Sequence, residues 1–161
     1  MESDRIYIHY GHSKFEREKF RKIKNIPMFV KPHGGLWASP VDAKLGWCDW
    51  CQGEHFHVDR LNTNFRFKLS ENSKVLHIRS LSDLADLPNL ADVLECLGLS
   101  NVWCWLDFEW LLENGFDAIE LHLSEEDKSN LGFMDGLYWR LYGWDCDSIL
   151  VMNPDVIEVV E

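Results

Sequence analysis

The sequence predicts a single α+β domain, and three observations support this. Short stretches in which apolar and polar residues alternate, such as residues 5–10 and 65–69, are typical of strands with one buried face. Other stretches, such as residues 80–87 and 107–113, have the spacing of helices. Strands and helices do not alternate strictly along the chain. We therefore expect two small, mostly antiparallel sheets with flanking helices.

The composition is that of one globular domain spanning residues 1–161. Hydrophobic residues make up 46% of the chain and aromatic residues 13%, including eight tryptophans. This is ample material for a packed core. The sequence contains no repeat, linker or low-complexity segment that would divide it.

Charge and cysteine content limit the partners and the compartment that we expect. Acidic residues outnumber basic ones 27 to 16, for a formal net charge of -11, which repels phosphate backbones and anionic membranes. The basic segment at 14–24, "KFEREKFRKIK", fits a solvated helix face better than a nucleic-acid site. No signal peptide or membrane-spanning run is apparent, and five cysteines, an odd number, fit reduced thiols. We expect a cytoplasmic protein without a membrane partner.

The first half of the chain yields five further elements after the strand at 5–10. The spacing at 14–24 predicts a helix. Residues 36–39 read as a short strand entered through two glycines, and a helix follows from Pro40 through Cys51. Residues 65–69 and 75–78, joined by a turn at Asn72, predict two adjacent paired strands.

The second half adds four helices and three strands. Helical spacing covers 80–87, 90–97, 107–113 and the aromatic-rich stretch 133–142, and Asn114-Gly115 ends the third of these. The remaining strands are expected at 117–123, 148–152 and 156–160.

Three pieces of these elements occur in a suggestive order: "IYIHYGH" (6–12), "GGLWASP" (34–40) and "FDAIEL" (116–121). This order resembles the ADP-ribosyltransferase family of NAD-consuming toxins and transferases. Its sites combine a histidine or arginine, then a tyrosine or serine, then a glutamate. The stretches at 65–84 and 141–160 also look like those of such domains. The resemblance implies a split core that binds NAD between two sheets, with no metal.

The resemblance makes Glu120 and His9 the catalytic candidates. Cleavage of the nicotinamide–ribose bond passes through an oxocarbenium-like state, which a carboxylate stabilises. Ile119 and Leu121 would face the core and place Glu120 on the opposite face of its strand. His9 would position the dinucleotide, with His12 as the alternative match. From the residues alone, Glu120 is better explained as an exposed strand glutamate, and His9 fits an ordinary hydrogen-bonded histidine equally well.

The expected NAD contacts come from the first two motifs. The ring of Tyr10 and the backbone at Gly11 would approach the ligand. Gly34 and Gly35 can adopt positive φ, which would allow the backbone there to approach the ligand closely. Trp37 would stack on nicotinamide, and Ser39 would hydrogen-bond the same end. In the histidine-led branch of the family a tyrosine is more usual at the position of Trp37. The indole of Trp37 has no hydroxyl, so it cannot make the hydrogen bond that the tyrosine hydroxyl would make. The full set of expected contacts is His9, Tyr10, Gly11, Gly35, Leu36, Trp37 and Ser39.

These residues lead to a mono-ADP-ribosyltransferase as the expected function, in a role such as toxin or phage effector. Ala118 stands where many arginine-modifying relatives carry a second acid, which disfavours an arginine acceptor. The acidic surface favours a protein acceptor over nucleic acid. A catalytically lapsed binding or inhibitory module and an NAD glycohydrolase remain the alternatives.

Other motifs carry weaker expectations. Cys48 and Cys51, with two histidines just after them, have ligand types for zinc, but the compressed spacing favours a helix. The acids Asp145 and Asp147 fit strand-entry residues better than a cation site. Arg140 could reach a ligand phosphate. The chain has no P-loop, Rossmann fingerprint or G-x-S-x-G elbow.

Overall fold

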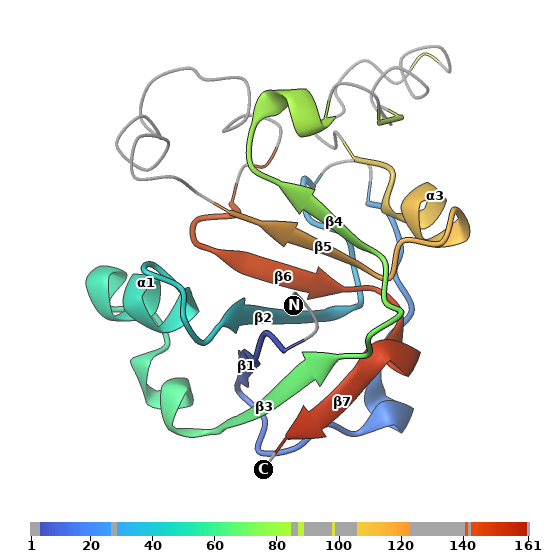
Figure 1. Ribbon diagram of the computed structural model, residues 1–161. Helices are drawn as coiled ribbons and strands as arrows, with labels where there is room; N and C mark the ends of the chain where they lie inside the picture. Colours follow the sequence, from blue (N-terminus) through green and yellow to red (C-terminus); the bar gives the residue numbers. More distant parts are fainter. Residues whose placement is uncertain are drawn as a thin grey trace.

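A computed structural model describes residues 4–26, 29–84, 87–88, 98, 106–122, 141 and 143–160. These residues form an α+β domain built on one mixed sheet of seven strands (Figure 1). The strands are β1 (Tyr7–Tyr10), β2 (Leu36–Pro40), β3 (Asn64–Leu69), β4 (Val75–Ile78), β5 (Ala118–Leu121), β6 (Ser148–Val151) and β7 (Ile157–Val160). Their order across the sheet is β4-β5-β6-β2-β1-β3-β7. Only the β4–β5 pair is parallel.

The expectation of two sheets is corrected to one, because β2 pairs on both of its edges. Residues Leu36 to Ala38 of β2 pair with β6. Only Ser39 and Pro40, at the end of β2, pair with β1, opposite Ile8 and Tyr7. The two halves of the sheet therefore join at this end of β2, where the N–H of Val41 also donates to the carbonyl oxygen of Ile6 at 2.9 Å, and their pairing stops on the side of Trp37.

Two helices and four 3-10 turns complete the described structure. The helices are α1 (Trp47–Glu54) and α3 (Phe108–Glu113), which lie at opposite ends of the strands in Figure 1. The 3-10 turns are η1 (Arg17–Lys19), η2 (Val58–Asn62), η3 (Leu81–Leu84) and η4 (Pro154–Val156). The side chain of Asp107 caps α3 by accepting a hydrogen bond from the backbone N–H of Trp110.

The helix expected over 14–24 is wrong, because this segment finds its backbone partners elsewhere in the chain. Only η1 is helical, and Lys24 forms an isolated antiparallel bridge with His33. The N–H of Gly35 donates to the carbonyl oxygen of Arg21 at 2.9 Å. Ile23, 1% exposed, anchors the extended run in the core.

The other expected elements have mixed outcomes. The strands expected near 65–69, 75–78, 117–123, 148–152 and 156–160 are confirmed within a residue or two. β3 and β4 are not neighbours: β3 pairs with β1 and β7, and β4 pairs with β5. The helix expected after Pro40 begins only at Trp47, and the one expected over 80–87 is the short turn η3. The helices expected over 90–97 and 133–142 lie outside the described residues, except that Leu141 is in a turn.

Apolar side chains pack on both faces of the sheet. One face buries a cluster that includes Phe65, Phe67 and Ile149. The other buries Ile119 and Leu150 beneath α3, together with other apolar side chains. Because both faces are covered, β5 and β6 are buried at every residue.

Among the described residues, no helix is long and apolar enough to cross a membrane.

Candidate functional site

A cavity of about 310 Å³ opens where β1 and β2 separate. His9 and Tyr10 line it from β1, and Trp37 and Ser39 line it from β2. The remaining wall consists of Ile8, Lys31, Ala38, Trp47, Gly143, Trp144, Asp145, Cys146 and Ser148. Four of the residues expected to contact NAD therefore lie at one site, which we call the strand-gap cavity.

His9 joins the two strands at this opening. Its Nδ1 lies 2.7 Å from the carbonyl oxygen of Trp37, which can only accept, so Nδ1 carries a proton. Burial lowers the pKa of His9 below 6.5, more than the Trp37 carbonyl raises it, and His12 lowers it further. A neutral ring protonated at Nδ1 leaves Nε2 as an acceptor, which now faces His12 Nδ1 at 2.9 Å.

Trp37 is held at the cavity by two neighbours. Trp144 packs edge-on against it, with ring centroids 4.6 Å apart at 73°. The ammonium of Lys31 lies 5.2 Å from the centre of the Trp37 ring. Burial lowers the pKa of Lys31, while the nearby Asp145 carboxylate opposes that shift. The indole is thus a rigid wall with one cation and one carboxylate beside it.

The hydroxyls of Ser39 and Tyr10 already have partners within the protein. Ser39 is 2% exposed, and its Oγ accepts the backbone N–H of Trp47 at 2.8 Å, at the start of α1. Burial, together with the charge of and a hydrogen bond to Cys48, raises the pKa of Tyr10 to about 12. Both residues line the cavity, but their hydroxyls hold α1 against the sheet.

A second cavity, of about 380 Å³, adjoins the first, because His9 and Trp37 line both. Its other lining residues are His12, Lys14, Phe15, Glu16, Lys19, Phe20, Arg21, Pro32, His33, Gly34, Gly35, Leu36 and Phe65. Lysine, arginine and histidine side chains gather here on a chain of net charge -11. We call it the basic cavity. The segment expected to be a solvated helix face instead supplies its wall.

The glycines of the first two motifs are required by the local backbone conformation and by close packing against neighbouring atoms. Gly34 and Gly35 have φ of +80° and +70°. A Cβ at Gly34 would lie 2.3 Å from the carbonyl oxygen of Lys22, and one at Gly35 would lie 2.6 Å from the side chain of Leu150. Gly11 lines neither cavity; its N–H donates to the carbonyl oxygen of Thr63 at 2.7 Å, in the turn after β1.

Glu120 does not join His9 and Trp37, contrary to the sequence-based expectation. It lines a separate cavity of about 580 Å³, together with Arg5, Tyr7 and His77. β6 lies between β5 and β2, and the registers Glu120–Ile149–Ala38 place Glu120 on the sheet face opposite Trp37. The alternative of an exposed strand glutamate is also wrong, because Glu120 is 0% exposed.

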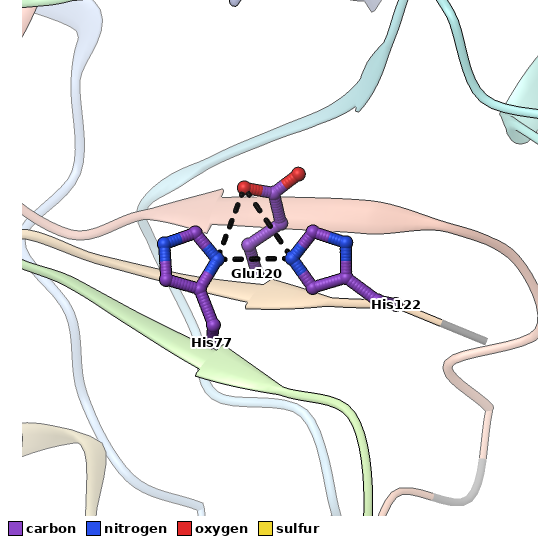
Figure 2. A group of neighbouring side chains, drawn as sticks. All are labelled: His77, Glu120 and His122. Carbon is purple, nitrogen blue, oxygen red and sulfur yellow. Dashed lines mark hydrogen bonds and ion pairs between the residues drawn. The ribbon is translucent and has the colours of Figure 1, made fainter. Parts of the chain in front are cut away.

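Glu120 is held by one side chain of β1 and by one from the segment that precedes β1. Tyr7 Oη donates to Oε2 at 2.9 Å, and Arg5 Nη1 lies 2.7 Å from Oε1. Two imidazoles approach Oε2, His77 Nδ1 at 3.6 Å and His122 Nε2 at 3.8 Å (Figure 2). Among the described residues, the side chains of His77, Glu120 and His122 form the group whose ligand atoms converge closely enough to hold a metal ion.

Asp145 is the carboxylate that lines the strand-gap cavity together with His9 and Trp37, and sequence reasoning missed it. Its only signal was the D-x-D pattern at the entry to a strand, where the structure indeed has Asp145 and Asp147, just before β6. Strand-entry acids are common, so the pattern alone did not point to a site. Lys31, which also lines the cavity, was missed as well, because a single lysine before the glycines belongs to no motif. Arg140 lies outside the described residues.

The helix expected around Cys48 and Cys51 is confirmed as α1. Cys48 is half-buried, and Cys51 is buried on the core side of the helix. His55 and His57 follow in left-handed conformations, with φ of 55° and 46°. These four residues are not in the converging ligand group described above.

Comparison of the chain with protein-family models, with curated proteins and with solved structures finds no match, so the argument for its function rests on its own residues.

Proposed function

We propose that the chain is an ADP-ribosyltransferase, which binds NAD across the strand-gap and basic cavities, cleaves the nicotinamide–ribose bond and transfers ADP-ribose to a macromolecule. The observation that carries this proposal is that His9 and Trp37 line both cavities. A ligand spanning them would meet aromatic rings and a carboxylate at one end and cations at the other.

The two environments match the two kinds of group in NAD. Aromatic rings and a volume of about 310 Å³ suit nicotinamide with its ribose, since ligand cavities start at about 300 Å³. Lys14, Lys19 and Arg21 in the basic cavity suit the pyrophosphate. Glu16 pairs with Lys19 at 2.9 Å, which leaves the positive charge concentrated toward the other two.

Asp145 takes the role in this proposal that the sequence assigned to Glu120. A carboxylate beside the ribose would stabilise the positive charge that develops as nicotinamide leaves. The unprotonated Nε2 of His9 would accept a hydrogen bond from a ribose hydroxyl, displacing His12. Trp37 would hold the nicotinamide ring in place. The split core implied by the family resemblance would correspond to the gap between β1 and β2.

The test is nicotinamide release from NAD by the purified chain, measured with NAD binding by calorimetry. Asp145→Asn should reduce release about 100-fold or more and leave binding nearly unchanged. Asp147→Asn, the matched control two residues away, should retain activity because Asp147 does not line the cavity. Full activity in Asp145→Asn would remove that residue from the role. If only Glu120→Gln abolished release, Glu120 would be the catalytic carboxylate, as the sequence predicted.

Two alternatives have separable outcomes. The engaged hydroxyls of Ser39 and Tyr10 favour a binding module that has lost catalysis, for which NAD would bind without nicotinamide release. An NAD glycohydrolase would release nicotinamide and leave free ADP-ribose. With labelled NAD, a transferase leaves the label on a macromolecule.

A further inference from the structure

The side chains of His77, Glu120 and His122 meet on one face of the sheet because of strand geometry. Glu120 and His122 are two residues apart along β5 and its extension, so they point to the same side. His77 on β4 is the direct cross-strand partner of Glu120 in the parallel β4–β5 pair. Figure 2 shows the two rings from neighbouring strands turned toward the carboxylate.

The three facing atoms are spaced as ligands of a single ion would be. His77 Nδ1 and His122 Nε2 are 2.9 Å apart, and each lies 3.6 or 3.8 Å from Glu120 Oε2. A point equidistant from these atoms lies about 2.0 Å from each. Zinc bonds to imidazole nitrogen and to carboxylate oxygen are about 2.0–2.2 Å long.

The surroundings hold the carboxylate in a ligating position. Arg5 occupies Oε1, and Tyr7 donates to Oε2, the oxygen that faces the imidazoles. Such outer contacts fix the orientation of metal-binding carboxylates in known sites. The His77 and His122 side chains are 18% and 23% exposed, so an ion can reach them from solvent.

We propose that His77, Glu120 and His122 bind one divalent transition-metal ion of the zinc type. Two imidazoles and one carboxylate are preferred ligands of zinc and its neighbours, whereas calcium and magnesium prefer oxygen. Three protein ligands leave a fourth position for water. The cavity of about 580 Å³ that His77 and Glu120 line adjoins the site. This site is separate from the strand-gap cavity and does not depend on the proposed function.

The test measures metal binding by the full chain after chelator treatment. Zinc chloride titrated by calorimetry should bind with a stoichiometry of one, and cobalt should give visible absorption without a thiolate charge-transfer band. His77→Gln and His122→Gln should each weaken zinc binding by at least about 100-fold, and Tyr7→Phe by about 10-fold. His33→Gln, an exposed histidine elsewhere, is the matched control and should bind as the unmodified chain does.

Two results would overturn the proposal. One is failure of the folded, unmodified chain to bind zinc, which would leave His77 and His122 as a hydrogen-bonded pair. The other is binding that survives both histidine variants but is lost in Cys48→Ser, which would move the ion to the C-x-x-C segment. Because the first result is read on the unmodified chain, an unfolded variant cannot obscure it.

Discussion

The imidazole Nδ1 of His9 lies 2.7 Å from the main-chain oxygen of Trp37, across the point where β1 and β2 stop pairing. A side chain thus replaces the backbone hydrogen bond that the sheet would otherwise make there. The bond explains how the gap stays open without leaving that carbonyl unsatisfied. It also fixes the tautomer of His9 and turns its Nε2 toward the cavity side, so structure and proposed chemistry depend on one group.

The burial of His9 predicts a pH dependence of stability specific to this residue, because burial outweighs the opposing effect of the bond to Trp37. Burial lowers the pKa of folded His9 below 6.5, whereas His9 in the unfolded chain titrates near its ordinary value. As pH falls below 6.5 the unfolded state takes up a proton that the folded state does not, so the free energy of unfolding decreases. Urea unfolding across this range should show a shallower decrease for His9→Gln.

The control for that experiment is His33→Gln, in which an exposed histidine is changed. It should keep the slope of the unmodified chain. Equal slopes for the His9 variant and the unmodified chain would mean that burial does not hold His9 neutral.

Two glycine substitutions should change stability in opposite directions. Gly34 has φ of +80°, and an added Cβ would lie 2.3 Å and 2.6 Å from two backbone oxygens that cannot move aside. Gly34→Ala should therefore lower the free energy of unfolding by about 1–3 kcal/mol or more. Gly53 lies inside α1, and an added Cβ would meet no other atom within 4 Å, so Gly53→Ala should raise stability by about 0.5–1 kcal/mol. Thermal melts of both variants measure the difference, and a shift in the same direction for both would contradict it.

The cysteines should differ in reactivity. Burial raises the pKa of Cys146 to about 12 and outweighs the opposing hydrogen bond from Ser39. At pH 8 the thiolate fraction of Cys146 is therefore on the order of 10⁻⁴. Cys51 is 0% exposed, and burial raises its pKa as well. Of the three cysteines that the structure describes, iodoacetamide should label the half-buried Cys48 first in the folded chain, and Cys146 and Cys51 only on unfolding.

Peptide mass spectrometry of labelled protein measures these rates one cysteine at a time. Rapid native labelling of Cys146 would show that the strand-gap cavity admits solvent to its thiol, contrary to the 4% exposure of that residue.

Local patterns predicted the strands well, because alternation is a property of neighbouring residues. They could not predict where Glu120 would lie, because this depends on the position of β6 in the sheet. β6 lies between β2 and β5, although it follows β2 in the sequence by more than a hundred residues. Similarly, residues 14–24 had helical spacing, but the bridge between Lys24 and His33 holds part of them extended. The approach of His77 to Glu120 rests on a parallel pairing of distant strands that the sequence does not reveal.

Ser39 offers a direct comparison of a scaffold role with a ligand-binding role. Its Oγ accepts the first N–H of α1, so Ser39→Ala leaves that half-buried donor without its partner. The free energy of unfolding should fall by about 1 kcal/mol, as for other lost helix caps. Under the proposed function, NAD affinity should change little, because the hydroxyl is already engaged. Chemical unfolding and NAD titration of the same preparation measure both quantities. A loss of affinity of 10-fold or more with unchanged stability would mean that Ser39 serves the ligand, as the sequence alone had predicted.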